Sequence, residues 1–401
     1  MRVIAPSAKL SRLAALAAVI LLSLTSYAQT RPATAPPVNS ESAVNMLVLG
    51  DSISWGQGLK DEHKAWFLVK KWLELNSGRP VRVQVEAHSG AVIGALTAPG
   101  ADPRTNYTLD GEISRAEPTI NDQIDNALRS LADPSQIDLV LVNGCINDVD
   151  ARRLLNAANT PDSIREFAEA KCGPPVEALL NRITLAFPSA HVVIFGYYPI
   201  ISEFTANDIF MRALAKRFYT PAAGEVRLND KGLRARLIAI NREWYQTSDQ
   251  MLANAARKID SELKTRGSHQ RVMFADAAFR PEHSFAANRS RLWGFDASTL
   301  RKILVLLTLG KVSLHTNDER QSQRSDLCKV LLKKPEQETP EEKANREDRL
   351  LRCRLAAVGH PNRKGAAMYA DAIGNLLKPL ITDTGWLKGA ATIAAPANPL
   401  R

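Results

Sequence analysis

Short apolar runs alternate along the chain with longer segments in which apolar residues recur every three or four positions. The runs are apolar on both faces, as buried parallel strands are. They span Met46–Leu49, Val81–Val85, Asp138–Val142, His191–Phe195 and Arg271–Phe274. The longer segments have the spacing of helices that bury one face. They span Ala65–Leu75, Ile120–Leu131, Pro175–Phe187, Gly232–Leu263 and Lys364–Leu377. This alternation predicts a doubly wound α/β domain around a parallel sheet.

The N-terminus has the pattern of a secretory signal. An apolar run, Leu13–Leu24, follows three basic residues and ends just before Ser26 and Ala28, which are small residues at the positions that a signal peptidase inspects. The run is too short for a stable membrane span. We therefore expect residues 1–28 to be a signal peptide that is cleaved near Ala28, and the mature protein to be secreted or periplasmic.

The rest of the chain divides by composition. Residues 29–44 are rich in Pro, Thr, Ser and Ala and are expected to form a flexible linker. Residues 45–387 are expected to form one domain, with a polar, partly helical insertion near 314–354. Residues 388–401 are rich in Ala and Pro and are expected to be a frayed tail.

Composition and charge narrow the class of protein. Of the 401 residues, 45% are hydrophobic and 23% are charged, which excludes a collagen-like or wholly disordered chain. The formal net charge of +10 falls to about +7 without residues 1–28. Basic residues outnumber acidic ones between Arg212 and Arg271, which fits either a solvated helix surface or a face toward an anionic partner. No pattern of interleaved basic and aromatic residues points to nucleic acid, and we expect a monomer.

Four short motifs carry candidate chemistry. Ser52 follows the first strand in Leu49-Gly50-Asp51-Ser52, and its hydroxyl needs a base to act as a nucleophile. Gly90 follows the second strand in His88-Ser89-Gly90 and can present a bare N–H to an oxyanion. Alone, the first motif equally fits a helix N-cap on Asp51, and the second fits an ordinary turn.

Of the other two motifs, one follows the third strand and one precedes the last helix. Asn147 lies in Gly144-Cys145-Ile146-Asn147-Asp148, where its amide can face developing negative charge while Asp148 fixes the neighbouring loop. His360 precedes Pro361 and can serve as a general base to a serine. An Asn-Asp turn and a structural histidine are the alternatives. Because three of the motifs follow parallel strands, they are expected to converge at one edge of the sheet, and His360 supplies the base they lack.

These four motifs, in the order Ser, Gly, Asn, His, resemble those of the SGNH hydrolases of the GDSL lipase and acylhydrolase type. The resemblance rests on GDSISWG at 50–56, Gly90, GCIND at 144–148 and GHPNRKG at 359–365, and it covers residues 45–377. It implies a three-layer α/β/α sandwich with a flavodoxin-like parallel sheet of about five strands. It also implies Ser52 as nucleophile and His360 as base, with an oxyanion hole from the N–H groups of Ser52 and Gly90 and the side chain of Asn147. Asp51 and Asp148 would support the site, and neither metal nor cofactor is implied.

The sequence departs from that family at two positions. Cys145 adds a residue between Gly144 and Ile146, although the match of Asn147 is kept. The family has an Asp three residues before the histidine, where this chain has Ala357. We therefore expect a Ser52–His360 dyad in which a main-chain carbonyl of Arg354–Val358 holds the Nδ1–H of His360. The alternative is a distant acid such as Asp276 or Asp296.

Four cysteines allow three disulfide pairings in a secreted protein. We prefer the local pairing. In it, Cys145–Cys172 ties the Asn147 loop to the following helix, and Cys328–Cys353 clamps the polar insertion. No closely spaced Cys or His pair predicts a metal site.

The function expected from these observations is a secreted serine esterase or lipase that cleaves acyl esters through an acyl-enzyme. Its substrate would be a small-molecule, lipid or carbohydrate ester, with the segment His283–Phe295 either lining its pocket or packing on the sandwich edge. A polysaccharide O-acetylesterase or a phospholipase of the same family are alternatives. So are a catalytically silent binding protein and a metal-dependent phosphoesterase using Asp51, Asp148 and His360.

Overall fold

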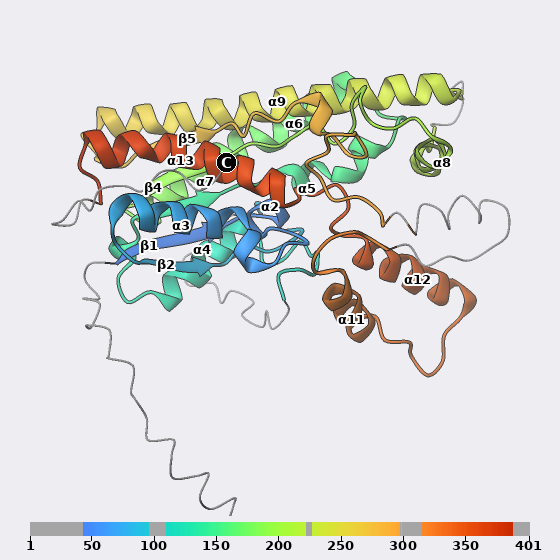
Figure 1. The fold of residues 1–401 in the computed structure, drawn as a ribbon, viewed down its shortest axis with the longest axis horizontal. Coiled ribbons are helices and arrows are strands. Elements are labelled where there is room, and N and C mark those ends of the chain that lie inside the picture. The colour runs from blue at the N-terminus through green and yellow to red at the C-terminus, as the bar shows by residue number, and fades with distance from the viewer. Residues whose placement is uncertain (1–42, 96–109, 222–226, 297, 299–314, 388–401) are drawn as a thin grey trace, which may run out of the picture. The chain divides into compact units, whose positions relative to one another are not determined.

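A five-stranded, all-parallel sheet forms the centre of the computed structural model (Figure 1). The structure describes residues 43–95, 110–221, 227–296, 298 and 315–387. The strands are β1 (Val44–Leu49), β2 (Val81–Val85), β3 (Leu139–Val142), β4 (His191–Phe195) and β5 (Val272–Ala275). Their order is β2-β1-β3-β4-β5, so the direction of winding reverses between β1 and β3. In doubly wound sheets, ligands bind in the crevice at that reversal.

Helices cover both faces of the sheet. The α-helices are α2 (Ser52–Trp55), α3 (Ala65–Ser77), α4 (Ile120–Ser130), α5 (Ile146–Val149), α6 (Pro161–Cys172), α7 (Pro174–Ala186), α8 (Ile209–Phe218), α9 (Asp230–Thr265), α11 (Gln321–Leu331), α12 (Pro340–Arg354) and α13 (Arg363–Asp383). Short 3-10 turns span Asp61–His63, Pro134–Gln136, Ala151–Leu155 and Pro281–His283. On one face α3 packs against α13, and on the other α4, α7 and α9 pack, with α6 alongside α9 (Figure 1).

The predicted fold class is confirmed. The predicted bounds match for β2 and β4 and differ by one or two residues at the ends of β1, β3 and β5. β1 begins at Val44, inside the segment expected to be a linker, and Val44 pairs with Val81. β3 and β4 are buried along their whole length, because helices lie on both sides of them. That burial explains why these strands read as continuous apolar runs.

The longest helix, α9, exceeds its predicted range at both ends. Asn229 caps its N-terminus by accepting a hydrogen bond from the N–H of Gly232, so the helix begins at Asp230. Its buried face includes Leu237, Ile240 and Trp244. The last helix, α13, begins after Asn362, whose side chain accepts from the N–H groups of Lys364 and Gly365. This cap fixes the chain just after His360.

The polar insertion contains two helices, α11 and α12, that lie side by side (Figure 1). The Cys328–Cys353 disulfide joins them, and Cys145–Cys172 joins the start of α5 to the end of α6. Both bonds of the preferred local pairing are therefore present. The predicted signal peptide at 1–28, nearly all of the predicted linker, and the predicted tail at 388–401 lie outside the described residues. Within the described part of the chain, no helix is long and apolar enough to cross a membrane.

Candidate active site

Ser52 lies at a tight turn directly after β1. Gly50 adopts a φ of 121°, and a Cβ at this position would come 2.4 Å from the carbonyl oxygen of Asn143, so only glycine fits. Asp51 caps α2 by accepting a hydrogen bond of 2.9 Å from the N–H of Ile53. The N-cap interpretation of Asp51 is thus correct, and it puts Ser52 at the first position of the helix.

Two buried amides that sequence analysis missed hold this turn. Gln123 of α4 pairs with both backbone groups of Gly50, at 2.7 and 2.9 Å. Asn143, after β3, accepts from the hydroxyl of Ser54 at 2.5 Å and donates to the carboxylate of Asp51 at 2.8 Å. A signal for Gln123 was available, since it falls on the same helix face as Ile120 and Ile124. Asn143 carries no such signal, since it follows the end of a strand.

His360 reaches Ser52 from the other end of the chain. Its Nε2 lies 2.8 Å from the Ser52 Oγ. The loop that carries it is fixed by backbone hydrogen bonds, from the Trp293 N–H to the His360 carbonyl (2.7 Å) and from the Gly359 N–H to the Trp293 carbonyl (2.9 Å). Trp293 belongs to the segment His283–Phe295, which thus supports the histidine loop, while Phe285 and Phe295 are buried in the core.

Burial lowers the pKa of His360 to about 4, and the nearby positive charge of Arg324 contributes to the lowering. The ring is therefore neutral at physiological pH, as a general base must be. Its Nδ1 is buried and has no hydrogen-bond partner, although the carbonyls of Ala357 and Val358 are close enough to raise the pKa against the other two effects. These two carbonyls belong to the segment Arg354–Val358 that the sequence predicts at the ring, but their contact with Nδ1 lacks the geometry of a full hydrogen bond.

Neither of the two acids considered as a distant partner is bonded to His360. Asp276 accepts from the N–H of Ala278, and Asp296 accepts from the N–H and hydroxyl of Ser298. Because the Nδ1 of His360 has no partner, both stay outside its hydrogen-bond shell.

Gly90 and Asn147 lie in adjoining loops. Gly90 has a φ of 83°, and the Nδ2 of Asn147 donates to the carbonyl of Ala91 at 2.9 Å. Asp148 accepts from the N–H of Ile93 at 3.1 and 3.2 Å, so it fixes the loop that follows Gly90. Within the described residues, the N–H groups of Ser52 and Gly90 have no acceptor. They remain available to a ligand.

Tyr197, also missed by sequence analysis, joins the first and third motifs. Its hydroxyl accepts from the N–H of Ile146 at 3.0 Å and donates to Asp51 at 3.2 Å. Burial raises the pKa of Asp51 to about 6, against the opposing effect of these hydrogen bonds. Cys145, next to Ile146, has an unusual φ of 116° for a residue with a side chain, and its disulfide to Cys172 anchors it there.

Metal ligation does not fit the arrangement of the acidic groups. Asp51 is bonded to Ile53, Asn143 and Tyr197, and Asp148 is bonded to Ile93. In the ranges that the structure describes, no group of three or more His, Cys, Asp or Glu side chains has the arrangement of a metal site.

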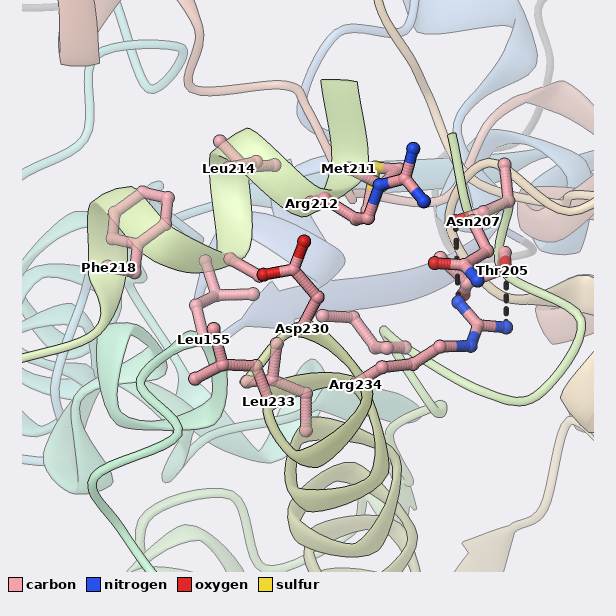
Figure 2. Close-up of a pocket in the computed structure, with 14 residues that line it drawn as sticks. Leu155, Thr205, Asn207, Met211, Arg212, Leu214, Phe218, Asp230, Leu233 and Arg234 are labelled. Carbon is pink, nitrogen blue, oxygen red and sulfur yellow. Dashed lines mark hydrogen bonds between the residues drawn. The ribbon is translucent and has the colours of Figure 1, made fainter. Parts of the chain in front are cut away.

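A separate apolar pocket lies between α8 and the start of α9. Its walls include Leu155, Met211, Phe218 and Leu233, and the guanidinium of Arg234 closes one side by donating to the carbonyl of Thr205 (Figure 2). Neither Ser52 nor His360 lines it. The basic segment 212–271 runs mostly along α9, where side chains such as Lys258 and Lys264 form ion pairs with acidic neighbours.

No protein-family model and no curated protein matches the chain. Among solved structures, the chain is similar to an extracellular lipase from Streptomyces rimosus, with 17% identity, a TM-score of 0.37, and coverage of 62% of this chain and 87% of that one. It is also similar to phospholipase A1 from Streptomyces albidoflavus, with 20% identity, a TM-score of 0.35, and coverage of 62% of this chain and 86% of that one. A third similar structure is a carbohydrate acetylesterase from Sinorhizobium meliloti, with 15% identity, a TM-score of 0.32, and coverage of 61% of this chain and 87% of that one. Likenesses at these scores assign neither a family nor an activity to this chain.

Proposed function

We propose that this protein is a secreted serine hydrolase that cleaves acyl esters through an acyl-enzyme on Ser52, with His360 as general base. The observation that carries the proposal is the 2.8 Å approach of the His360 Nε2 to the Ser52 Oγ. Nucleophilic catalysis by serine requires a base within hydrogen-bond reach of the hydroxyl, and a neutral imidazole can act as that base. The pair also lies at the winding reversal of the parallel sheet, where ligands bind.

The proposed reaction has two steps. The Ser52 Oγ attacks the ester carbonyl carbon while its proton moves to the His360 Nε2. The N–H groups of Ser52 and Gly90 would then donate to the oxyanion, together with the second hydrogen of the Asn147 amide, since the first is bonded to Ala91. Collapse of the tetrahedral intermediate releases the alcohol, which takes the proton from Nε2. Water, activated by the same nitrogen, then hydrolyses the acyl-enzyme.

The test is hydrolysis of p-nitrophenyl esters over a series of acyl chain lengths, beside labelling with a serine-reactive phosphonate. We expect the wild type to be labelled on Ser52 and Ser52→Ala to lose both labelling and turnover while its circular dichroism stays unchanged. Ser54→Ala is not the matched control, because Ser54 is bonded to Asn143. An exposed serine, Ser261, serves instead. Ser52→Ala activity within tenfold of wild type would refute the nucleophile.

Secretion is part of the same proposal. It is supported by the signal-like pattern of residues 1–28 and by the two disulfides, which persist in oxidising compartments. N-terminal sequencing of protein recovered outside the cytoplasm should begin near Gln29. An intact Met1 on that material would overturn it.

A further inference from the structure

A buried ionic cluster lies where the polar insertion meets the rest of the domain. Its centre is Arg324 of α11, whose side chain has no exposed surface. The guanidinium bonds Glu112 at 2.6 Å, Asp318 at 2.5 and 3.0 Å, and the hydroxyl of Thr316 at 3.0 Å. Its Nε donates to the carbonyl of Arg354 at 3.1 Å. Buried charges of this kind add little stability compared with apolar packing, so their presence calls for another reason.

The cluster adjoins the histidine loop. A Cβ at Gly58 would lie 2.8 Å from the Cβ of Ala357 and 3.0 Å from the Cβ of Asp318, so Asp318 and Ala357 both pack closely against this glycine. Ala357 is fully buried, and its carbonyl accepts from the N–H of His360 at 3.0 Å. Asp318 therefore lies beside the segment that carries the base.

His360 needs a counter-charge during the reaction. It becomes an imidazolium inside a buried site, and residues 354–359 contain no acid. The charged groups that act on it are Arg324 and Asp318, with opposite signs: Arg324 lowers the pKa of His360 and Asp318 raises it. Glu112, the second carboxylate of the cluster, is bonded to Arg324 at 2.6 Å.

We propose that Asp318 and Arg324 are positioning residues for His360: Arg324 holds its loop through the Arg354 carbonyl, and Asp318 supplies the negative charge that balances the imidazolium. The insertion thus provides, from another part of the chain, the negative charge that a carboxylate next to the histidine would provide, without its hydrogen bond to Nδ1. This inference rests on the proposed function, because it concerns the same base.

The test compares two variants that should move the histidine in opposite directions. Asp318→Asn leaves the charge of Arg324 less balanced, so the acid limb of kcat/KM should move to lower pH and kcat should fall about tenfold or more. Arg324→Gln leaves Asp318 without its cation, so the limb should move to higher pH by about half a unit or more. The substrate is p-nitrophenyl acetate, and the active fraction is counted by phosphonate titration.

Two further variants separate this role from a structural one. Arg324→Lys keeps the positive charge but loses the forked hydrogen bonds of the guanidinium. The acid limb of its kcat/KM pH profile should therefore match that of the wild type, while its kcat falls. Arg346 and Glu338 form another ion pair, at 2.6 Å, in the same insertion. Arg346→Gln is therefore the control, and it should change neither the acid limb of kcat/KM nor kcat. If Arg324→Gln does not fold, Asp318→Asn and Arg324→Lys carry the comparison.

The outcomes distinguish the two proposals. An active, phosphonate-labelled wild type whose acid limb stays unmoved in Asp318→Asn and Arg324→Gln, or moves the same way in both, overturns the positioning role alone. A wild type that is neither labelled nor active on any ester overturns the function itself.

Discussion

Replacing Asn143 by Ala should weaken the whole domain as well as the candidate site. Asn143 is fully buried after β3 and joins that strand to the turn after β1. Its Oδ1 accepts from the hydroxyl of Ser54 at 2.5 Å and, at 3.3 Å, from the N–H groups of Asp51 and Ser54. Its Nδ2 donates to the carboxylate of Asp51 at 2.8 Å. Alanine removes all four hydrogen bonds, and the groups of Asp51 and Ser54 that they leave behind are buried.

The size of the effect follows from the groups left without partners. A buried donor or acceptor without a partner costs about 1–3 kcal/mol. Two short bonds, to the hydroxyl of Ser54 and to the carboxylate of Asp51, are lost outright, and the two long ones count for little. We expect Asn143→Ala to lower the free energy of unfolding by about 2–6 kcal/mol, a large part of the roughly 5–15 kcal/mol that holds a domain folded. The carboxyl of Asp51 should also become harder to ionise.

Urea unfolding followed by circular dichroism measures this loss, with an unchanged slope showing that the same surface is exposed. The matched control is Asn254→Ala, an exposed asparagine on α9, which should change stability by less than about 0.5 kcal/mol. The kcat of Asn143→Ala should also drop, because Ser52 is on the turn that Asn143 holds. A loss of stability below about 1 kcal/mol would refute this reasoning, since it would mean that water or another side chain replaces the lost bonds.

Three further expectations concern the base, the oxyanion donor and the insertion. Because the neutral form of His360 is the proposed base and its pKa is about 4, kcat/KM should stay level from pH 7 down to about 5 and fall below that; a midpoint near 6.5 would contradict the burial argument. Asn147→Ala should lower kcat by about 10² to 10³ with little change in KM, measured with p-nitrophenyl acetate, and a pure KM effect would make Asn147 a substrate-binding residue instead. Cys328→Ser with Cys353→Ser opens a loop of 25 residues and should lower the free energy of unfolding by about 3 kcal/mol, whereas an unchanged urea midpoint would show that the bond constrains nothing.

The sheet could be predicted from the sequence because its strands are local apolar runs with helices between them. Val140 and Val193, for example, are apolar because both faces of β3 and β4 are covered. The winding reversal then explains why motifs that follow β1 and β3 meet. The ends of helices and strands were harder to predict than their existence. The start of α9, for example, depends on the hydrogen bond from the Gly232 N–H to the Asn229 side chain, which the spacing of apolar residues does not reveal.

The polar contacts of the site were out of reach of that reasoning. Arg324 lies in a charged segment whose composition is typical of an exposed surface, yet its side chain is fully buried. Its partner Glu112 is 212 residues away in the sequence, so the local pattern around Arg324 contains no sign of the ion pair. Tyr197 and Asp51 are likewise separated by 146 residues. A polar residue that is buried by a distant partner has the same local pattern as a solvated one, so composition and period cannot tell them apart.

The separation of Ser52 and His360 also has a consequence for how the protein is made. The two side chains are 308 residues apart in the chain, and the histidine is held by a loop that ends in the last helix. Long-range contacts of this kind form late, because the intervening chain must first be brought together. A ribosome-bound or truncated chain that ends before His360 would carry Ser52 without its proposed base. In a refolding experiment, the return of ester hydrolysis should therefore lag behind the return of the helical circular dichroism signal. The length of this lag measures how long α13 takes to dock onto the sheet.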